Sequence, residues 1–196
     1  MFVNNPCAAG CGSPAITGGS LCFIHQANPE QEYTRICDFI KDNKVIKDFS
    51  AVGMRFEDTD FSGHQFFGCN FKDASFFNCR FSDVKMGMSF FDFSSFYKCD
   101  FTKTDLQFMS FAGANFEQCD FSGSEIIHVN FGGASILETS FDNSNLYNSR
   151  FITSDLSKTT FVNCNLKRVN FTNAKQNEIL FKSSNTAEAL MEFQKQ

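Results

Sequence analysis

The sequence is poor in several residues that ordinary globular cores and binding sites use. It contains no Trp, three Tyr and three Pro in 196 residues. It has no run of about 20 apolar residues to span a membrane, and the amino terminus lacks the basic and apolar regions of a signal peptide. The 17 Lys and Arg stand against 22 Asp and Glu, and a net charge of −5 argues against broad electrostatic binding of nucleic acid or anionic lipid. We therefore expect one soluble domain in the cytoplasm, without a membrane or direct nucleic-acid partner.

Cysteine, by contrast, is plentiful, with nine copies. An odd number in a chain without an export signal argues against a disulfide framework. Reduced thiols then have two ordinary roles, because they either bind metal ions or are buried as small hydrophobic side chains.

Phenylalanine is the strongest bias, with 28 copies, and its positions repeat. From Phe56 to Phe181 every fifth residue is large and apolar, except Gln176. Two residues before each of these positions, from Met54 to Ile179, lies a second series that is mostly small or β-branched. No charged residue between 56 and 181 belongs to either series. Both series are therefore expected to point into a core.

A period of five excludes an α-helical face, because successive members would be scattered around the helix axis. Two inward residues separated by one outward residue match a short β-strand, and the next two residues, rich in Gly, Asn, Asp, Ser and Lys, must turn the chain. A longer period is also visible, since positions 61, 81, 101, 121, 141, 161 and 181 are all Phe. The repeat therefore predicts an all-β solenoid whose coils contain four five-residue units.

Several units share a motif, in which a small residue is followed by Asp or Asn and then by Leu or Phe. The clearest are Cys119-Asp120-Phe121-Ser122-Gly123, Ala114-Asn115-Phe116, Ser154-Asp155-Leu156-Ser157 and Cys164-Asn165-Leu166. The motif resembles that of the pentapeptide-repeat family, and the resemblance covers residues 50–183. It implies a right-handed quadrilateral parallel β-helix over that range.

Both ends of such a solenoid are exposed edges that need caps. Residues 29–49 begin with Pro and acidic residues and continue with an amphipathic pattern, which predicts a helical cap at the first coil. Residues 184–196 predict a short carboxy-terminal capping helix that begins at Ser184 or Asn185 and continues through Phe193. We expect this second helix to cover the last coil or, alternatively, to form a homodimer contact.

Residues 1–28 hold the strongest chemical motif. Cys7 and Cys11 form one close pair, Cys22 and His25 form another, and a Gly- and Ser-rich loop joins them. This spacing suits a tetrahedral zinc ion, because each pair closes a small chelate turn, and it resembles short zinc-knuckle modules. The segment has few apolar residues, so bound metal would supply its folding energy. We expect structural Zn²⁺; the alternative is reduced thiols without metal, and Cys37 is a weaker candidate ligand.

The repeat itself offers no arrangement for catalysis. A filled rod has no interior pocket where a nucleophile, a base and an orienting group converge. Ser and Thr fill the small series and the turns, while Cys79, Cys99 and Cys119 stack in one column of that series, where buried thiols serve packing. We therefore expect no enzymatic activity.

Function is then expected on the outer surface. Folded on a 20-residue coil, apolar residues outside the inward series gather near one corner, and such patches usually mark contacts. The alternative is that the amino-terminal segment folds back over them. The predicted interaction surface consists of Phe67, Met88, Phe90, Phe108 and Ile127.

Acidic residues form a second candidate surface. The predicted acidic belt comprises Asp100, Asp105, Glu117, Asp120, Glu125, Glu138 and Asp142. Some pentapeptide-repeat proteins protect DNA gyrase with a rod that resembles duplex DNA, so a DNA mimic that binds a type II topoisomerase is the alternative function. The mild net charge and the basic residues after position 150 weaken this alternative. We therefore favour a non-enzymatic scaffold that presents a side face to a protein partner. A nucleic-acid-binding knuckle has less support, because residues 1–30 contain no Lys or Arg.

Overall fold

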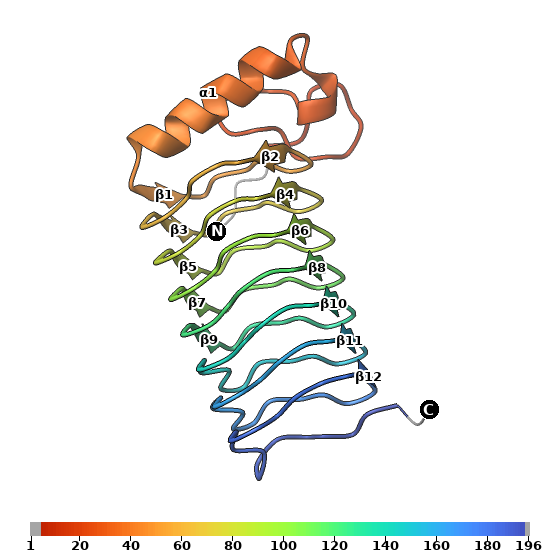
Figure 1. Cartoon of the computed structure of the whole chain (residues 1–196). Helices are drawn as coiled ribbons and strands as arrows, with labels where there is room; N and C mark the ends of the chain where they lie inside the picture. Colours follow the sequence, from red (N-terminus) through yellow and green to blue (C-terminus); the bar gives the residue numbers. More distant parts are fainter. Residues whose placement is uncertain (1–4, 195–196) are drawn as a thin grey trace.

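The computed structural model describes residues 5–194 as a stack of coils with a helix across one end (Figure 1). A 3₁₀ turn, η1 (Phe23–His25), and the helix α1 (Pro29–Asp42) precede the coils. Within the described residues, two parallel sheets form opposite walls. The five-stranded sheet contains β1 (Val45–Lys47), β3 (Gln65–Phe67), β5 (Lys85–Gly87), β7 (Asp105–Gln107) and β9 (Glu125–Ile127). The seven-stranded sheet contains β2 (Arg55–Glu57), β4 (Ser75–Phe77), β6 (Ser95–Tyr97), β8 (Asn115–Glu117), β10 (Ser135–Leu137), β11 (Asp155–Ser157) and β12 (Lys175–Asn177).

Each strand pairs in parallel with a strand 20 residues away in the chain. Ile46 lies opposite Phe66, and Phe56 lies opposite Phe76. Isolated bridges on the two remaining walls keep the same step. The coil length predicted from the Phe positions is confirmed, and the chain forms a parallel β-solenoid of about seven turns.

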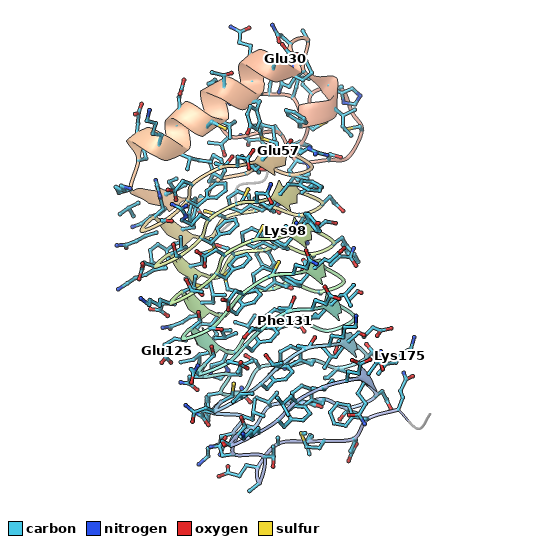
Figure 2. All side chains as sticks on the ribbon, viewed as in Figure 1. Glu30, Glu57, Lys98, Glu125, Phe131 and Lys175 are labelled. Atoms are coloured by element: carbon cyan, nitrogen blue, oxygen red, sulfur yellow. The ribbon has the colours of Figure 1, made fainter. Side chains whose placement is uncertain are left out.

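Stacked phenylalanine rings fill the axis of the rod. Phe101 and Phe121 lie one above the other, nearly parallel, with ring centroids 4.4 Å apart. Rings of neighbouring columns meet edge to face, as Phe96 and Phe101 do at 5.4 Å and 69°. Both arrangements are favourable for aromatic rings. Figure 2 shows Phe131 inside the coils and Glu125 pointing outward from β9.

The small inward series ties successive coils together. Ser94 Oγ donates to Phe71 O at 2.7 Å, and Ser124 Oγ donates to Phe101 O at 2.9 Å. These bonds satisfy hydroxyls that would be costly to bury unpaired. In the same series, burial raises the pKa of the Cys69 thiol to about 11. A thiol in this environment stays protonated and packs as a small hydrophobic group.

The corners of the coils use left-handed backbone. Gly123 and Asn143 have φ of +71° and +59°, and both residue types tolerate this conformation well. Met88, Phe93 and Phe108 occupy equivalent corners with φ of +49°, +59° and +54°. A positive φ is an outlier for such bulky residues.

The helix α1 caps the first coil. Asn28 accepts a hydrogen bond from Gln31 N at 3.1 Å, while Ile36 and Ile40 are buried on the helix face toward the coil. His64, buried in the second series, lies with Nε2 3.0 Å from Ile40 O and so links the helix to the rod. The helix ends at position 42 and the first coil begins at position 45, so the helical cap is shorter than the expected 29–49 and the solenoid begins before position 50.

The carboxy-terminal helix predicted for residues 184–196 is wrong over 184–194, which continue the solenoid. Asn185 and Leu190 each bridge to the residue 20 positions earlier. The five-residue register explains the difference, because Ser184 occupies a small-series position and Met191 a large one. Positions 195–196 of that prediction, like positions 1–4 of the amino-terminal one, lie outside the described residues.

Candidate metal centre and exposed apolar edge

The predicted metal ligands lie on two turns at the amino-terminal end of the rod. Cys7 and Cys11 flank a turn in which Gly10 N donates to Cys7 O at 2.9 Å. Gly10 has φ of +75°, which glycine adopts without steric cost. Cys22 precedes η1, and His25 N donates to Cys22 O at 3.1 Å. Each ligand pair is therefore presented by a turn that its own backbone closes.

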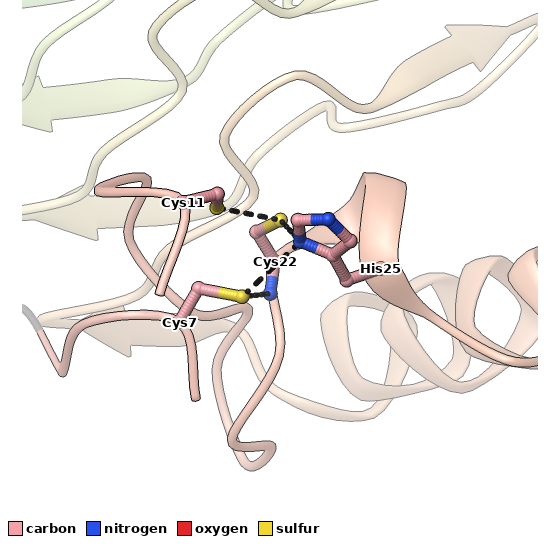
Figure 3. Close-up of side chains that lie close together, drawn as sticks. All are labelled: Cys7, Cys11, Cys22 and His25. Atoms are coloured by element: carbon pink, nitrogen blue, oxygen red, sulfur yellow. Dashed lines mark hydrogen bonds between the residues drawn. The ribbon is translucent and has the colours of Figure 1, made fainter. Parts of the chain in front are cut away.

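The four side chains converge on one point (Figure 3). Cys7 Sγ and Cys22 Sγ lie 3.5 and 3.3 Å from His25 Nδ1, and Cys11 Sγ lies 3.7 Å from Cys22 Sγ. With Zn–S bonds near 2.3 Å and Zn–N bonds near 2.0 Å, a tetrahedral site has S–S edges of about 3.8 Å and S–N edges of about 3.5 Å. The spacing and the donor set therefore fit a four-coordinate zinc ion, and four protein ligands are typical of a structural site.

Local hydrogen bonds favour the thiolate forms of two ligands. Cys22 N donates to Cys7 Sγ at 3.3 Å, and this bond is the main reason that the pKa of Cys7 is lowered to about 6. The backbone and hydroxyl of Ser13 lower the pKa of Cys11. Burial raises the pKa of Cys22, while hydrogen bonding to the Cys7 thiol raises the pKa of His25. Zinc binds thiolates, so the hydrogen bonds to Cys7 and Cys11 favour the metal-binding form of these two ligands.

The loop between the two ligand pairs also ends one wall of the β-helix. Thr17 N donates to Ser50 O at 3.0 Å, and Ser50 N donates to Thr17 Oγ1 at 2.6 Å. Ser50 in turn bridges to Asn70, so Thr17 caps the exposed edge of that ladder. Beside it, Ile16 is buried in the same core as the Phe columns. The sequence did not reveal this junction, because Thr17 and Ser50 do not differ from the many other hydroxyl residues.

The predicted interaction surface lies along the five-stranded wall and the corner that follows it, and it reaches Phe90 on the next wall. Met88 and Phe108 are 60 % and 59 % exposed, and Phe67, Phe90 and Ile127 are half-buried. The described part of the amino-terminal segment therefore leaves Met88 and Phe108 uncovered. We call this surface the apolar edge.

Two features of the apolar edge are not required by the solenoid fold. Met88 and Phe108 keep bulky side chains exposed on left-handed backbone, at a cost on the order of 1–2 kcal/mol each. Gly87 leaves a notch beside them, where a Cβ atom would lie 3.2 Å from the Phe67 ring. Phe67, Met88 and Phe108 line an open groove of about 310 Å³ over this notch. Phe93 is 66 % exposed, but it lies at a different corner.

The acidic residues are spread over three walls. Asp105 and Glu125 lie in strands of the five-stranded sheet, Glu117 lies in a strand of the seven-stranded sheet and Glu138 at its corner, and Asp100, Asp120 and Asp142 lie on a wall between the sheets. Some of them serve the coils themselves, since Asp100 accepts from Thr102 N at 2.9 Å and Asp120 accepts from Ser122 N at 2.8 Å. These bonds cap turns. The charges are thus not gathered on a single face.

Neither of the helical segments in residues 5–194 has the length and apolar character needed to cross a bilayer. A search of curated proteins returned no match.

Known structures share this fold. Two solved structures of trypsin-treated variants of QnrB1, a plasmid-mediated fluoroquinolone resistance protein, match with TM-scores of 0.56 and 0.50 at 21 % and 15 % sequence identity. The first match covers 76 % of this chain and 81 % of the other, and the second covers 76 % and 83 %. The family model for pentapeptide repeats matches eight copies over residues 74–107, 99–136 and 137–175. These segments span 102 of the 196 residues, from 74 to 175. The chain belongs to the pentapeptide-repeat family.

Proposed function

We propose that the protein is a non-enzymatic scaffold for protein–protein interaction. A rigid β-helical rod holds the apolar edge in a fixed geometry, and a partner protein covers that edge. The observation that carries this proposal is the exposure of Met88 and Phe108 on left-handed corner backbone, where most other corners of the rod have Gly or a polar residue. Exposed apolar patches of this kind usually mark contact sites.

The substitution Phe108→Glu tests the proposal. Glu is tolerated at such corners, because Glu138 and Glu178 adopt φ of +49° and +53° at the corresponding corner beside the seven-stranded sheet. We expect the variant to fold with a denaturation midpoint only slightly below that of wild type, because it loses the stack on His128, and to lose the partner that wild-type protein retains after crosslinking in its native cell. The matched control Phe93→Glu changes an equally exposed Phe outside the edge and should keep that partner. Equal capture by wild type and both variants would contradict the proposal.

We further propose that Cys7, Cys11, Cys22 and His25 hold one structural Zn²⁺ in an amino-terminal unit of residues 1–28. The ion would fix the two ligand turns and thereby hold Thr17 against the first coil. Elemental analysis should find about one zinc per chain in wild-type protein and none in the Cys7→Ser, Cys22→Ser double variant. Metal-free protein with a fully protected amino-terminal segment in hydrogen exchange would refute this assignment.

The alternative function is a DNA mimic that binds a type II topoisomerase such as DNA gyrase. The solenoid fold shared with a fluoroquinolone resistance protein supports it, whereas the distribution of acidic residues over three walls does not. Supercoiling by gyrase, measured with and without the purified protein and a quinolone, separates the two functions. Unchanged supercoiling and unchanged quinolone inhibition would eliminate the alternative.

A further inference from the structure

The corner that carries Met88 and Phe108 continues along the rod as a mixed aromatic and cationic surface. One residue per coil occupies it, and these residues, which we call the corner column, are Met88, Phe108, His128, Asn148 and Arg168. The His128 ring stacks on Phe108, with centroids 4.9 Å apart and an interplanar angle of 8°. Asn148 Nδ2 lies 2.6 Å from His128 Nδ1. The column is therefore continuous, and it changes from apolar to cationic along its length.

Two arginines define its cationic end. Arg168 donates to the Tyr147 hydroxyl at 3.2 Å, and its guanidinium carbon lies 5.9 Å from the Tyr147 ring centroid. Arg150 lines a hollow of about 180 Å³ together with Phe108 and His128. Within the described part of the chain, neither arginine forms an ion pair, whereas three lysines in the same third of the rod do. The two guanidinium groups are thus available to carboxylates from another molecule.

We propose that the apolar edge and the corner column bind a linear segment of a partner protein that carries an apolar side chain and, four to six residues away, one or two carboxylates. The apolar side chain occupies the groove at Gly87, and the carboxylates pair with Arg150 and Arg168. Coils spaced by about 4.8 Å place these arginines roughly 14 and 19 Å from the groove. An extended segment covers about 3.3 Å per residue, which gives the stated separation. This inference rests on the proposed scaffold function and specifies its partner.

The acidic residues nearby favour a peptide over a nucleic acid. Asp105 lines the groove opposite Lys85, so the two charges offset each other there, and Glu125 points outward on the next coil of the same wall (Figure 2). A nucleic-acid strand carries a phosphate at every nucleotide, so part of it would face these carboxylates. A segment with acidic residues at one end alone avoids them.

Selection from a phage-displayed library of random 12-residue peptides on immobilised full-length protein tests this inference. We expect enriched peptides to pair an aliphatic or aromatic residue with Asp or Glu four to six positions away. A synthetic copy of the most enriched peptide should bind at least tenfold more weakly to Phe108→Glu and to Arg150→Glu. The peptide should bind the Phe93→Glu and Lys103→Glu variants, which alter other corners, with the same affinity as wild type. Higher ionic strength should weaken its binding.

The outcomes separate this inference from the scaffold function. Peptides that lose affinity with Phe108→Glu but not with Arg150→Glu or Arg168→Glu would overturn the acidic requirement and leave the scaffold function standing. Peptides that respond to none of the three would contradict both. If no sequence is enriched, the inference that the ligand is a linear peptide is wrong. The crosslinking experiment then remains as the test of the scaffold function. If wild-type protein binds a labelled 20-nucleotide single strand and Arg150→Glu does not, the ligand of this surface is a nucleic acid and not a peptide.

Discussion

The two ends of the rod follow the same five-residue repeat, but they differ in how the terminal coil is covered. At the amino-terminal end α1 lies over the first coil, and Phe61 is fully buried. At the other end Phe181 occupies the same column and is half-buried. Leu180 and Leu190, in the last coils, are 47 % and 50 % exposed.

The contrast between Phe61 and Phe181 shows that an inward position does not by itself make a side chain buried. A residue in a solenoid is covered from both sides by its neighbouring coils, and at an end one of these coils must be replaced by a cap. Gln176 occupies a large-series position in the last coils and is exposed. The stability of each end therefore depends on its cap as much as on its own sequence.

The largest expected effect comes from truncating the same column at its two ends. Phe61→Ala removes a fully buried ring that stacks on Phe81 at 4.6 Å, and it should lower the free energy of unfolding by about 3–5 kcal/mol. Phe181→Ala removes a half-buried ring, and its cost should stay near 1–2 kcal/mol. Urea denaturation followed by circular dichroism measures both. Equal costs would mean that the amino-terminal cap does not set the difference between the ends.

Removing the metal should weaken the amino-terminal end selectively. At a zinc concentration of about 100 times the dissociation constant, binding contributes roughly 2.7 kcal/mol to the unit that it stabilises. Chelation, or the Cys7→Ser, Cys22→Ser variant, should therefore speed hydrogen exchange around Thr17 and Ser50 and leave the coil of Phe171 unchanged. The matched control Cys37→Ser removes a thiol outside the cluster and should retain zinc. Uniform loss of protection along the whole rod would show that the cap and the coils unfold as one unit.

Much of the fold was predictable because a solenoid repeats one local rule. Each inward position has the same requirement in every coil, so the Phe and small-residue series set the coil length without reference to distant contacts. The convergence of Cys7, Cys11, Cys22 and His25 was equally accessible, since metal ligation imposes its own spacing. Both predictions depend on constraints that act within a short stretch of chain.

The parts that the sequence did not reveal depend on which segments meet in space. Leu190 and Phe193 also have helical spacing, and the pairing of Asn185 with Asn165 decides in favour of another coil. The contact between Thr17 and Ser50 joins segments 33 residues apart and leaves no pattern in either. Such features require the neighbouring coil to be known first.

A smaller effect tests whether burial, rather than residue type, determines how much a Phe contributes to the free energy of unfolding of this rod. Phe108→Gly loses the stack on His128, worth about 0.5–1.5 kcal/mol, and relieves left-handed strain on the order of 1–2 kcal/mol. The free energy of unfolding should therefore stay within about 1 kcal/mol of wild type, far from the cost of Phe61→Ala. Urea denaturation under the same conditions gives the comparison. A loss above 3 kcal/mol, the low end of the range for buried Phe, would show that the corner column supports the fold.

The smallest effect concerns acid at the amino-terminal end. The hydroxyl and backbone of Ser62 lower the pKa of Asp60 from its ordinary value of 3.8, and Ser62 N donates to Asp60 Oδ1 at 2.9 Å. Because the folded pKa is the lower one, this bond stabilises the fold above pH 4, and the contribution disappears as pH falls through the folded pKa. Asp60 is exposed, so solvent screening keeps the effect below about 1 kcal/mol.

Asp60→Asn keeps an acceptor for Ser62 N but does not titrate. Its loss of unfolding free energy between pH 5 and pH 3 should therefore be slightly smaller than that of wild type. Leu180 stands in the same column at the other end and has no titrating group. The acid-dependent difference should accordingly be seen in hydrogen exchange near Asp60 and not near Leu180, and an equal response at both positions would show that acid acts on the rod as a whole.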